Sequence, residues 1–331
     1  MSTTSLIALA SLAAPILAAY QTKWNFNSTN FWDGANVAQP GFQFINAPDT
    51  SFTQGFAQYV GIDEALSSGL AKYNSGKVHL GVDATNKYST SSTGRKSVRL
   101  QSYGYFDNGL LVADFAHVPV AGCGMWPAFW VYQGEDQTAY SEIDILENVN
   151  VHTANTHSFY TSEQCTINVQ TGSLVPEKST NCHWTANGPS SQGCSFNAPE
   201  GTFNQPFNDQ YKVIALQVES DRIRIWHFKK TEVPADLSSA SPNPDAWTKT
   251  PTVHITPKSC NFAQAFRHFR IIINITFCGS WAGDDFVNTN YAGQCKAQTG
   301  SNDCKSWVAN NPGDFVNTFF EFNSIKLFQR T

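Results

Sequence analysis

The sequence predicts an all-β protein, built as one large antiparallel sandwich. Short runs of β-branched and aromatic residues recur along the chain, each bounded by Gly, Asn, Asp or Pro. No amphipathic helix of useful length accompanies them. Aromatic residues make up 13% of the 331 residues and charged residues only 14%, a balance that suits the burial of a large core. Sandwiches of this kind can exceed 200 residues as one domain.

Nine runs have the composition of strands, and two of them form a predicted hairpin. The runs are KVHLGV (77–82), SVRLQSY (97–103), GLLVADFAHV (109–118), PAFWVY (127–132), SEIDILE (141–147), YKVIALQV (211–218), RIRIWHF (222–228), FRIIINITF (269–277) and FFEFNSIKLF (319–328). The polar pair Ser220-Asp221 separates two of them, as a hairpin turn requires. The nearest helix candidate, EALSSGLAKY (64–73), is weakened by Gly69 at its centre.

The first 19 residues read as a secretion signal, because they form an uncharged apolar run that ends in small residues. We therefore expect a signal peptide over 1–19 and a single secreted, extracellular domain over 20–331. The loop-like stretches 165–210 and 231–258 lie between strands and are expected to decorate one sheet system. No later segment is apolar over the length needed to cross a bilayer, so a membrane partner is not expected.

Eight cysteines favour disulfides over metal binding, since an even count is typical of secreted chains. They lie at positions 123, 165, 182, 194, 260, 278, 295 and 304. Two clusters, 165–194 and 278–304, fall in loop-like sequence and suggest stapled surface loops. The sequence leaves the pairing open.

Two glycosylation sequons agree with a secretory route, at Asn27 and Asn274. Only Asn27 lies in loop-like sequence. Asn274 falls inside FRIIINITF, where a glycan would disrupt a strand, so its occupancy is disfavoured. The net charge of −5 and the lack of a basic block exclude nucleic acid as an expected partner. Flat, uncharged ligands such as sugars suit the aromatic content better.

The most informative segment is SEIDILE, which places Glu142, Asp144 and Glu147 in one predicted strand. Alternate side chains of a strand point to opposite faces, so Glu142 and Asp144 share a face and Glu147 does not. A β-bulge between Asp144 and Glu147 would bring all three to one face. The two glutamates could then bring their carboxyls to about 5 Å, the separation of a retaining glycosidase pair.

Three neighbouring carboxyls cannot all ionise freely, so the pKa of at least one must rise, as a general acid requires. Two other interpretations of the segment stay open. One is a solvated edge strand with an acidic outer face. The other is a Ca²⁺ site, although such sites usually draw on polar loops rich in Asp, Asn and Gly.

Tryptophans flank the acidic segment on both sides. GMWPAFWVY carries Trp126, Phe129 and Trp130, and FCGSWAG carries Trp281. Alternation puts Trp126 and Trp130 on one strand face and Phe129 on the other, so one of these sets should be core. The other set would offer a stacking surface to sugars.

These motifs together resemble glycoside hydrolase family 16, in particular the secreted fungal endo-1,3(4)-β-glucanases, also called laminarinase-like enzymes. The resemblance rests on WPAFW, EIDILE, a following N-x-N, RKSVRLQS, the SPNPDAW loop and NITFCGSWAG, and runs from about Trp24 to Phe328. It implies a concanavalin-like β-jelly-roll sandwich with the substrate cleft on the concave sheet. The spacing E-x-D-x-x-E is the bulged form, unlike the E-x-D-x-E of lichenases and of xyloglucan and fungal cell-wall transglycosylases.

The resemblance also implies roles for individual residues. Glu142 corresponds to the nucleophile, Glu147 to the acid/base and Asp144 to an assisting carboxylate. Trp126 and Trp281 correspond to sugar-contacting residues. Two departures bear on substrate preference: Tyr160 takes the place of a cleft histidine, and Ser280 stands where an aspartate is common. Because of its place in the cleft, Tyr160 is also expected to contact the substrate.

The sequence therefore predicts a retaining endo-β-glucanase for β-1,3 or mixed β-1,3/1,4 glucans. The expected partner is the β-glucan itself, with no cofactor and no metal, and the chain is expected to act as a monomer. A β-glucan transglycosylase on the same scaffold is the nearest alternative, and a non-catalytic glucan-binding lectin is another. A protease is excluded, because no histidine lies in a recognisable Ser or Cys nucleophile motif.

Overall fold

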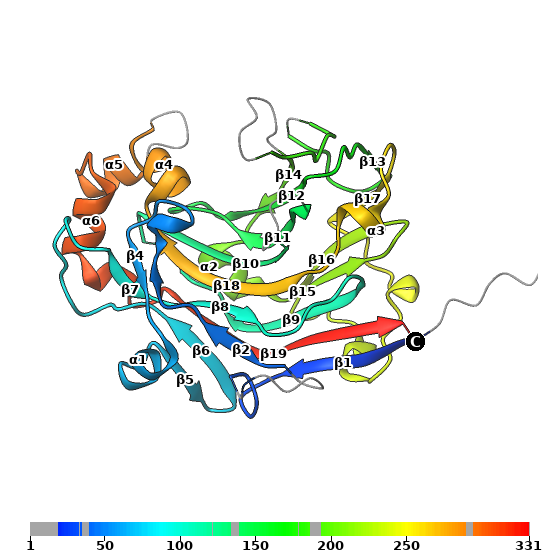
Figure 1. The fold of residues 1–331 in the computed structure, drawn as a ribbon, viewed down its shortest axis with the longest axis horizontal. Coiled ribbons are helices and arrows are strands. Elements are labelled where there is room, and N and C mark those ends of the chain that lie inside the picture. The colour runs from blue at the N-terminus through cyan, green and yellow to red at the C-terminus, as the bar shows by residue number, and fades with distance from the viewer. Residues whose placement is uncertain are drawn as a thin grey trace, which may run out of the picture.

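Two antiparallel sheets stacked face to face form the body of the protein, as Figure 1 shows. The computed structural model describes residues 19–32, 34, 40–120, 122–133, 139–177, 179–185, 193–288 and 294–330. The predicted signal segment, 1–19, lies outside these ranges except for Ala19. The predicted all-β sandwich is confirmed.

The first sheet has seven strands and carries the candidate site on its outer face. Its order from edge to edge is β14 (Cys194–Glu200), β12 (Ala154–Thr161), β11 (Ser141–Glu147), β10 (Met125–Gln133), β18 (Arg270–Phe277), β8 (Arg99–Ser102) and β2 (Phe42–Phe44). The acidic segment SEIDILE is therefore the third strand of the sheet, not a solvated edge strand.

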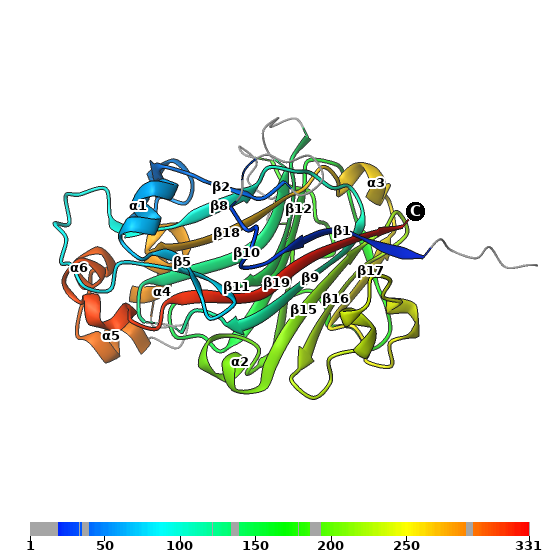
Figure 2. The same cartoon turned by 90° about the horizontal axis from the view of Figure 1, so that it is seen from below.

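The second sheet has nine strands and closes the other side of the sandwich, where Figure 2 shows its long strands running side by side. Its order is β13 (Ile167–Val169), β17 (Val253–Pro257), β16 (Ile223–Lys229), β15 (Tyr211–Val218), β9 (Gly109–His117), β19 (Phe319–Arg330), β6 (Lys77–Gly81) and β5 (Ala71–Asn74), with β1 (Tyr20–Phe26) paired to β19. β15 and β16 pair antiparallel, which confirms the predicted hairpin.

A small sheet and several short helices surround the sandwich. The small sheet consists of β3 (Ala47–Pro48), β4 (Ala57–Tyr59) and β7 (Arg95–Ser97). The helices are α1 (Ile62–Ser67), α2 (Asn204–Gln210), α3 (Phe262–Ala265), α4 (Asp284–Val287), α5 (Gln294–Thr299) and α6 (Cys304–Asn310), with single turns η1 (Asp49–Ser51), η3 (Ala235–Ser238), η4 (Pro244–Ala246), η5 (Gly279–Gly283) and η6 (Pro312–Phe315). Within the described ranges, no helix is long and apolar enough to cross a membrane.

The main core lies between the two sheets. Its buried side chains come from segments spread along the described chain, the first being Trp24 and the last Leu327. Strand β10 shows how alternation divides the chain between this core and the outer face. Phe129 and Val131 are buried in the core, whereas Trp126 and Trp130 are half-buried on the outer face. The aromatic pair with the parity of Trp126 is therefore the one available to a ligand.

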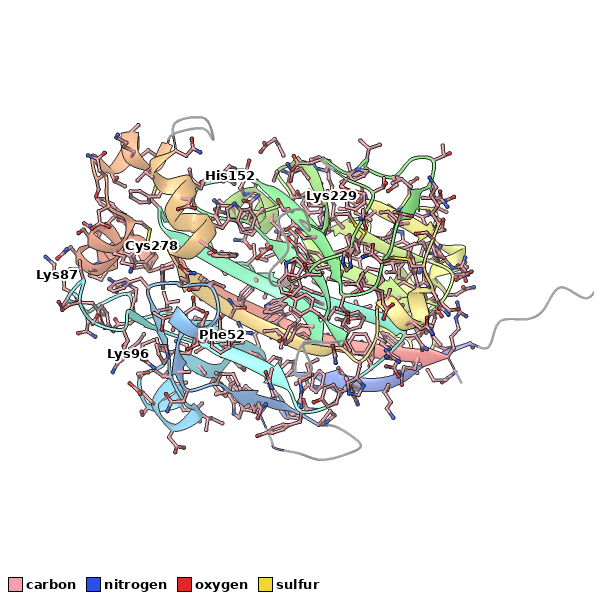
Figure 3. The ribbon with its side chains drawn as sticks, turned by 45° about the horizontal axis from the view of Figure 1, so that its top comes forward. Phe52, Lys87, Lys96, His152, Lys229 and Cys278 are labelled. Atoms are coloured by element: carbon pink, nitrogen blue, oxygen red, sulfur yellow. A yellow bond between two sulfur atoms is a disulfide. The ribbon has the colours of Figure 1, made fainter. Side chains whose placement is uncertain are left out.

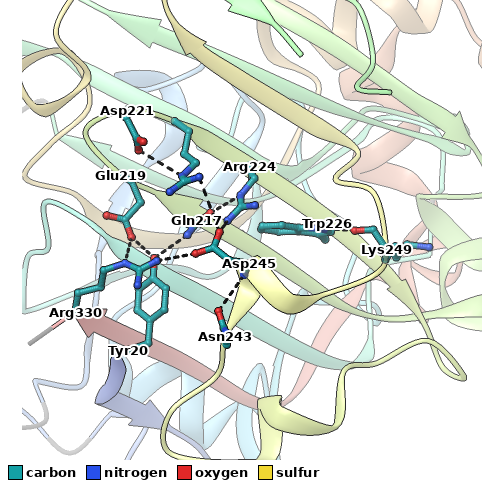
Figure 4. Close-up of polar contacts among 11 residues, drawn as sticks. Tyr20, Gln217, Glu219, Asp221, Arg224, Trp226, Asn243, Asp245, Lys249 and Arg330 are labelled. Atoms are coloured by element: carbon teal, nitrogen blue, oxygen red, sulfur yellow. Dashed lines mark hydrogen bonds and ion pairs between the residues drawn. The ribbon is translucent and has the colours of Figure 1, made fainter. Parts of the chain in front are cut away.

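The outer face of the nine-stranded sheet is sealed by the segment 231–252. Trp247 packs against Trp226 and Phe228 of β16 at ring distances of 5.0 and 5.3 Å. Beside them a polar cluster ties the termini to this segment (Figure 4): Arg224 donates to Gln217 and to Asp245, each at 2.5 Å. Tyr20 of β1 and Arg330 of β19 both donate hydrogen bonds to Glu219, which connects these two terminal strands to the cluster.

Four disulfides connect the eight cysteines, so the expectation of disulfides is confirmed. They are Cys123–Cys295, Cys165–Cys260, Cys182–Cys194 and Cys278–Cys304. The expectation that each cluster staples its own loop is only half right. Two bonds stay within a cluster, but the other two join segments 172 and 95 residues apart.

The stretch 165–210, expected to be a decorating loop, contributes more than decoration. It supplies β13 to one sheet and the edge strand β14 to the other. The sequence CSFNAPE contains Asn, Ala, Pro and Glu, which are uncommon in strands, so its strand character was not visible from composition. β14 forms one wall of the site described next.

Candidate active site

A cleft crosses the outer face of the seven-stranded sheet, and the three acids of β11 lie at its middle. It has two arms of about 510 and 650 Å³, which meet at Glu142, Asp144 and Glu147. The first arm extends over β10, β18 and β8 and is lined by Phe52, Arg99, Trp130, Tyr132, Tyr140 and Asn274, among others. The second arm extends over β12 and β14 and is lined by His152, Thr156, Ser158, Asn197, Glu200 and Trp281, among others. Figure 3 labels Phe52 and His152, one from each arm.

A β-bulge brings the three acids to one face. In the pairing of β10 with β11, Trp130 faces Asp144 and Phe129 faces Leu146, so Ile145 is an extra residue in β11. The bulge restores Glu147 to the face of Glu142 and Asp144, while the side chains of Ile143, Ile145 and Leu146 remain buried. The predicted bulge is confirmed.

The bulge interrupts the backbone ladder, and Asn155 of β12 replaces the missing bonds. β11 and β12 pair only at Ser141–Ile143, so the backbone beyond needs other partners. Asn155 is fully buried, and its side-chain Nδ2 donates to the Ile145 carbonyl at 2.9 Å. Its Oδ1 accepts from the Glu147 amide at 2.7 Å. One side chain thus satisfies both polar groups exposed by the bulge.

Two buried histidines, His157 and His227, lie behind the acids and contact Asn155, and His157 also contacts the backbone of Asp144. His157 Nδ1 lies 3.2 Å from the carbonyl oxygen of Asp144. Its Nε2 and that of His227, from the opposite sheet, lie 3.3 and 3.4 Å from Asn155 Nδ2. Burial lowers the pKa of His157 to about 4, so the ring stays neutral, and Nδ1 donates to the carbonyl.

The pKa values of the two glutamates are both raised by burial but are affected by different neighbours. Burial raises the pKa of Glu147 to about 8, and the charge of Glu142 adds to the rise, against a hydrogen bond from Trp126. Burial also raises the pKa of Glu142, to about 7, but a hydrogen bond from Tyr140 and the charge of Arg99 oppose the rise. The neighbours of Glu142 favour its ionised form through both a hydrogen bond and a positive charge, whereas Glu147 has one hydrogen bond and the negative charge of Glu142 beside it. This difference suits an acid at 147 and a nucleophile at 142.

Asp144 lies between the glutamates and is 4% exposed. Burial raises its pKa well above the usual range, and the charges of Glu142 and Glu147 raise it further. A protonated Asp144 spares the cleft a third negative charge. In the described ranges, no group of three or more His, Cys, Asp or Glu side chains is arranged to hold a metal ion.

The three residues expected to contact sugar all line the cleft. Trp126 donates from Nε1 to Glu147 Oε1 at 2.7 Å and meets Trp281 edge to face at 5.5 Å. Tyr160 is paired with Glu142 across β11 and β12. Gly193 packs so closely on the Tyr160 ring that a Cβ there would lie 2.3 Å from it, which excludes larger residues.

Several cleft residues were missed from the sequence. Tyr132 and Tyr140 had a usable signal, because they share the parity of Trp126 or of Glu142 in their segments. Arg99, Phe52 and Trp184 had none, since they reach the cleft from distant parts of the chain. Arg99 lies between two rings, 4.2 Å from the centre of Phe52 and 5.2 Å from that of Trp130.

Asn274, the second sequon, belongs to the cleft as well. It is 4% exposed, and its Oδ1 accepts a hydrogen bond from Trp130 Nε1 at 2.8 Å. A glycan on its Nδ2 would have to occupy the first arm. The structure therefore gives a physical reason for the expectation that this sequon is disfavoured.

An open cleft with a buried carboxyl pair on a β-sandwich is the arrangement of a polysaccharide-cleaving glycosidase, and comparison with known proteins agrees. A profile of the XgeA-like catalytic domain of glycoside hydrolase family 16 matches residues 42–328, and the chain belongs to this family. It is 35% identical over 313 residues to endo-1,3(4)-beta-glucanase xgeA of Emericella nidulans, covering 92% of this chain and 47% of that protein. It is 34% identical to a probable glycosidase of Schizosaccharomyces pombe, covering 94% of this chain and 69% of that protein. The chain spans about half the length of most curated relatives it matches.

Solved structures agree with the family and with its jelly-roll fold. An elongating family 16 β-1,3-glucosyltransferase superposes with a TM-score of 0.80 at 33% identity, covering 94% of this chain and all of the other. Laminarinase 16A from Phanerochaete chrysosporium superposes with a TM-score of 0.79 at 28% identity and the same coverages. That structure contains two β-glucans, 6-O-glucosyl-laminaritriose, in both donor and acceptor sites.

The support of the bulge by Asn155 can be tested by substitution. Asn155→Ala leaves the Ile145 carbonyl and the Glu147 amide without partners, and each unsatisfied buried group costs about 1–3 kcal/mol. We expect a large loss in the free energy of unfolding, measured by chemical denaturation. Asn168→Ala, on the exposed surface of the edge strand β13, is the matched control and should change little. Equal effects at the two positions would show that Asn155 does not support the bulge.

The raised pKa of Asp144 predicts how stability depends on pH. The folded state retains a proton that the unfolded state loses near pH 4, so each further pH unit disfavours folding by up to about 1.4 kcal/mol, until the folded-state pKa is reached. Asp144→Asn removes this penalty. The variant should gain melting temperature over the wild type as the pH rises above 4, and should gain little at pH 4. Asp63→Asn, exposed on α1, is the control. A difference that stays constant with pH would contradict the raised pKa.

Proposed function

We propose that the protein is a secreted, retaining endo-β-glucanase that hydrolyses β-1,3 or mixed β-1,3/1,4 glucans. One observation carries the proposal: the bulge at Ile145 places Glu142 and Glu147 on one face, at the middle of a cleft open toward both arms. An open cleft accepts the interior of a chain, as an endo-acting enzyme requires. The related endo-1,3(4)-β-glucanases and the laminarinase that binds β-glucan support the substrate class.

Glu142 acts as the nucleophile in the first step. One of its carboxylate oxygens attacks the anomeric carbon, and the bond from that carbon to the glycosidic oxygen breaks. Glu147 donates its proton to the departing oxygen. Trp126 holds Oε1 of Glu147 at 2.7 Å, which leaves Oε2 to carry the proton. The products are a covalent glycosyl-enzyme and a shortened chain.

Water completes the cycle in the second step. Glu147, now ionised, takes a proton from a water molecule, whose oxygen attacks the anomeric carbon and releases the Glu142 carboxylate. Two inversions restore the β configuration. Asp144, kept protonated by its surroundings, does not add a third charge beside the reacting carboxylates.

A β-glucan transglycosylase is the second candidate. The related structure of an elongating β-1,3-glucosyltransferase favours it, and so does the second arm, whose Thr156, Ser158 and Asn197 offer hydrogen-bonding groups to an acceptor sugar. A sugar hydroxyl would then replace water in the second step, with the same protein groups.

Secretion is part of the proposal. It is supported by the four disulfides, since such bonds persist in oxidising compartments outside the cytosol.

The substrate and the reaction can be tested together. The wild type is incubated with laminarin, lichenan, cellulose and xyloglucan, and the products are sized by chromatography. A hydrolase should release short β-1,3 or mixed-linkage oligosaccharides from laminarin or lichenan. Products longer than an added oligosaccharide would favour the transglycosylase. Binding without any product would indicate a lectin, and glucose alone would contradict an endo-acting cleft.

Azide rescue should separate the roles of the two glutamates. Glu142→Ala removes the nucleophile, so azide can attack directly and give the α-glycosyl azide by one inversion. Glu147→Ala removes only the proton donor and base. With an aryl β-glucoside that has a good leaving group, the intermediate still forms, and azide then gives the β-glycosyl azide. Glu163→Ala, an exposed glutamate in the loop after β12, is the control and should retain full activity. The opposite pairing of azide products would reverse the assignment.

A further inference from the structure

Tyr140 contacts the carboxyl group of Glu142 directly. It lies one residue before β11 and two before Glu142, so its side chain has the same parity as the three acids. Its hydroxyl donates to Oε2 of Glu142 at 2.5 Å, a length typical of a hydrogen bond to an ionised oxygen. Among the described residues, the side-chain hydrogen bond to the Glu142 carboxyl comes from Tyr140.

The Tyr140 ring is held on several sides. Trp184 packs against it at 4.3 Å between ring centres, and Tyr132 meets it edge to face at 5.6 Å. The backbone amide of Ser162 donates to the Tyr140 carbonyl at 2.9 Å, which fixes the chain next to the start of β11. The hydroxyl is therefore aimed at Oε2 by packing and by the backbone.

The hydroxyl remains a donor over the working pH range. Burial raises the pKa of Tyr140 far above its ordinary value, and the neighbouring charge of Glu142 raises it further. The phenol thus keeps its proton while Glu142 changes between carboxylate and ester. On Glu147 the corresponding contact comes from the indole N–H of Trp126, which donates only.

We propose that Tyr140 is a positioning residue for the nucleophile: it holds Oε2 of Glu142, so that Oε1 is the oxygen that attacks the anomeric carbon. This inference rests on the proposed function. In the first step the Oε1–carbon bond forms and the bond to the leaving oxygen breaks, while Tyr140 keeps its proton. In the second step water attacks the carbon, the Oε1–carbon bond breaks, and negative charge returns to the carboxylate.

The hydrogen bond from Tyr140 favours the charged carboxylate over the neutral ester. It therefore strengthens as Glu142 leaves in the second step, and it keeps Glu142 ionised before the first step. Losing it should slow release of the sugar from Glu142 and shift the titration of Glu142 to higher pH. A tyrosine with only a structural role would produce neither effect.

The test compares Tyr140→Phe with the wild type. The acidic limb of the pH profile of kcat/KM reports Glu142 in the free enzyme, and it should move to higher pH in the variant. We expect kcat to fall by about ten- to one-hundred-fold, the effect of one hydrogen bond to a charged group. With an activated aryl glycoside, more glycosyl-enzyme should accumulate at steady state, as intact-protein mass spectrometry can measure. The melting temperature should stay close to that of the wild type, because the ring remains.

Tyr160→Phe is the matched control, because Tyr160 lines the same cleft beside Glu142 but its hydroxyl hydrogen-bonds Ser158. It is expected to change KM and to leave the acidic limb in place. An unmoved acidic limb in Tyr140→Phe, or an equal shift in both variants, would overturn the inference.

A readout that does not require turnover separates this inference from the proposed function. The Glu142 carboxyl is titrated by ¹³C NMR, assigned with Glu142→Gln, and its pKa should be higher in Tyr140→Phe than in the wild type. An unchanged titration refutes the contact even in an active enzyme. If the Glu142 pKa is higher in Tyr140→Phe but the wild type cleaves no β-glucan, the contact between Tyr140 and Glu142 is supported. The proposed function is then refuted, and the positioning role with it.

Discussion

The site depends on one extra residue in one strand. A strand of regular register would direct Glu147 into the core beside Ile143, or force the apolar residues outward, because successive side chains alternate between faces. The bulge at Ile145 resolves this conflict and keeps the apolar residues buried. Its cost is a break in the ladder, and Asn155 offsets that cost with bonds to both orphaned backbone groups. Chemistry and packing are thus both satisfied at the same position.

A second constraint is the accumulation of negative charge in a partly buried cleft. Three carboxyls on one face disfavour each other's ionisation, and burial strengthens the effect. The surroundings then distinguish the glutamates: Glu142 receives the hydroxyl of Tyr140 and lies within the field of Arg99, whereas Glu147 receives one indole N–H. The proposed acid and the proposed nucleophile are chemically identical side chains, so only their neighbours can make them differ.

The bulge and the acid trio could be predicted because parity is a local property of the chain. A regular strand cannot place all three acids on its outer face and all the apolar residues between them in the core. This conflict can be seen in the seven residues SEIDILE. The parity of Trp126 and Trp130 likewise predicted that their side chains lie on the same face of the strand. Asn155 and His157 could not be identified, because their role depends on which strand pairs with β11 and in which register. Arg99 and Trp184 reach the cleft through tertiary contacts, and the disulfides that join distant segments are set by the same long-range geometry.

In the proposed mechanism, the bulge makes Glu142 and Glu147 a pair that acts on the same sugar by two successive inversions. The most direct measurement follows the anomeric proton of the first-formed product by ¹H NMR, within the first minutes of cleavage and before mutarotation. We expect the new reducing end to appear first as the β anomer. An initial α anomer would show a single inversion, and the arrangement of the two carboxyls described above could not then be the catalytic one.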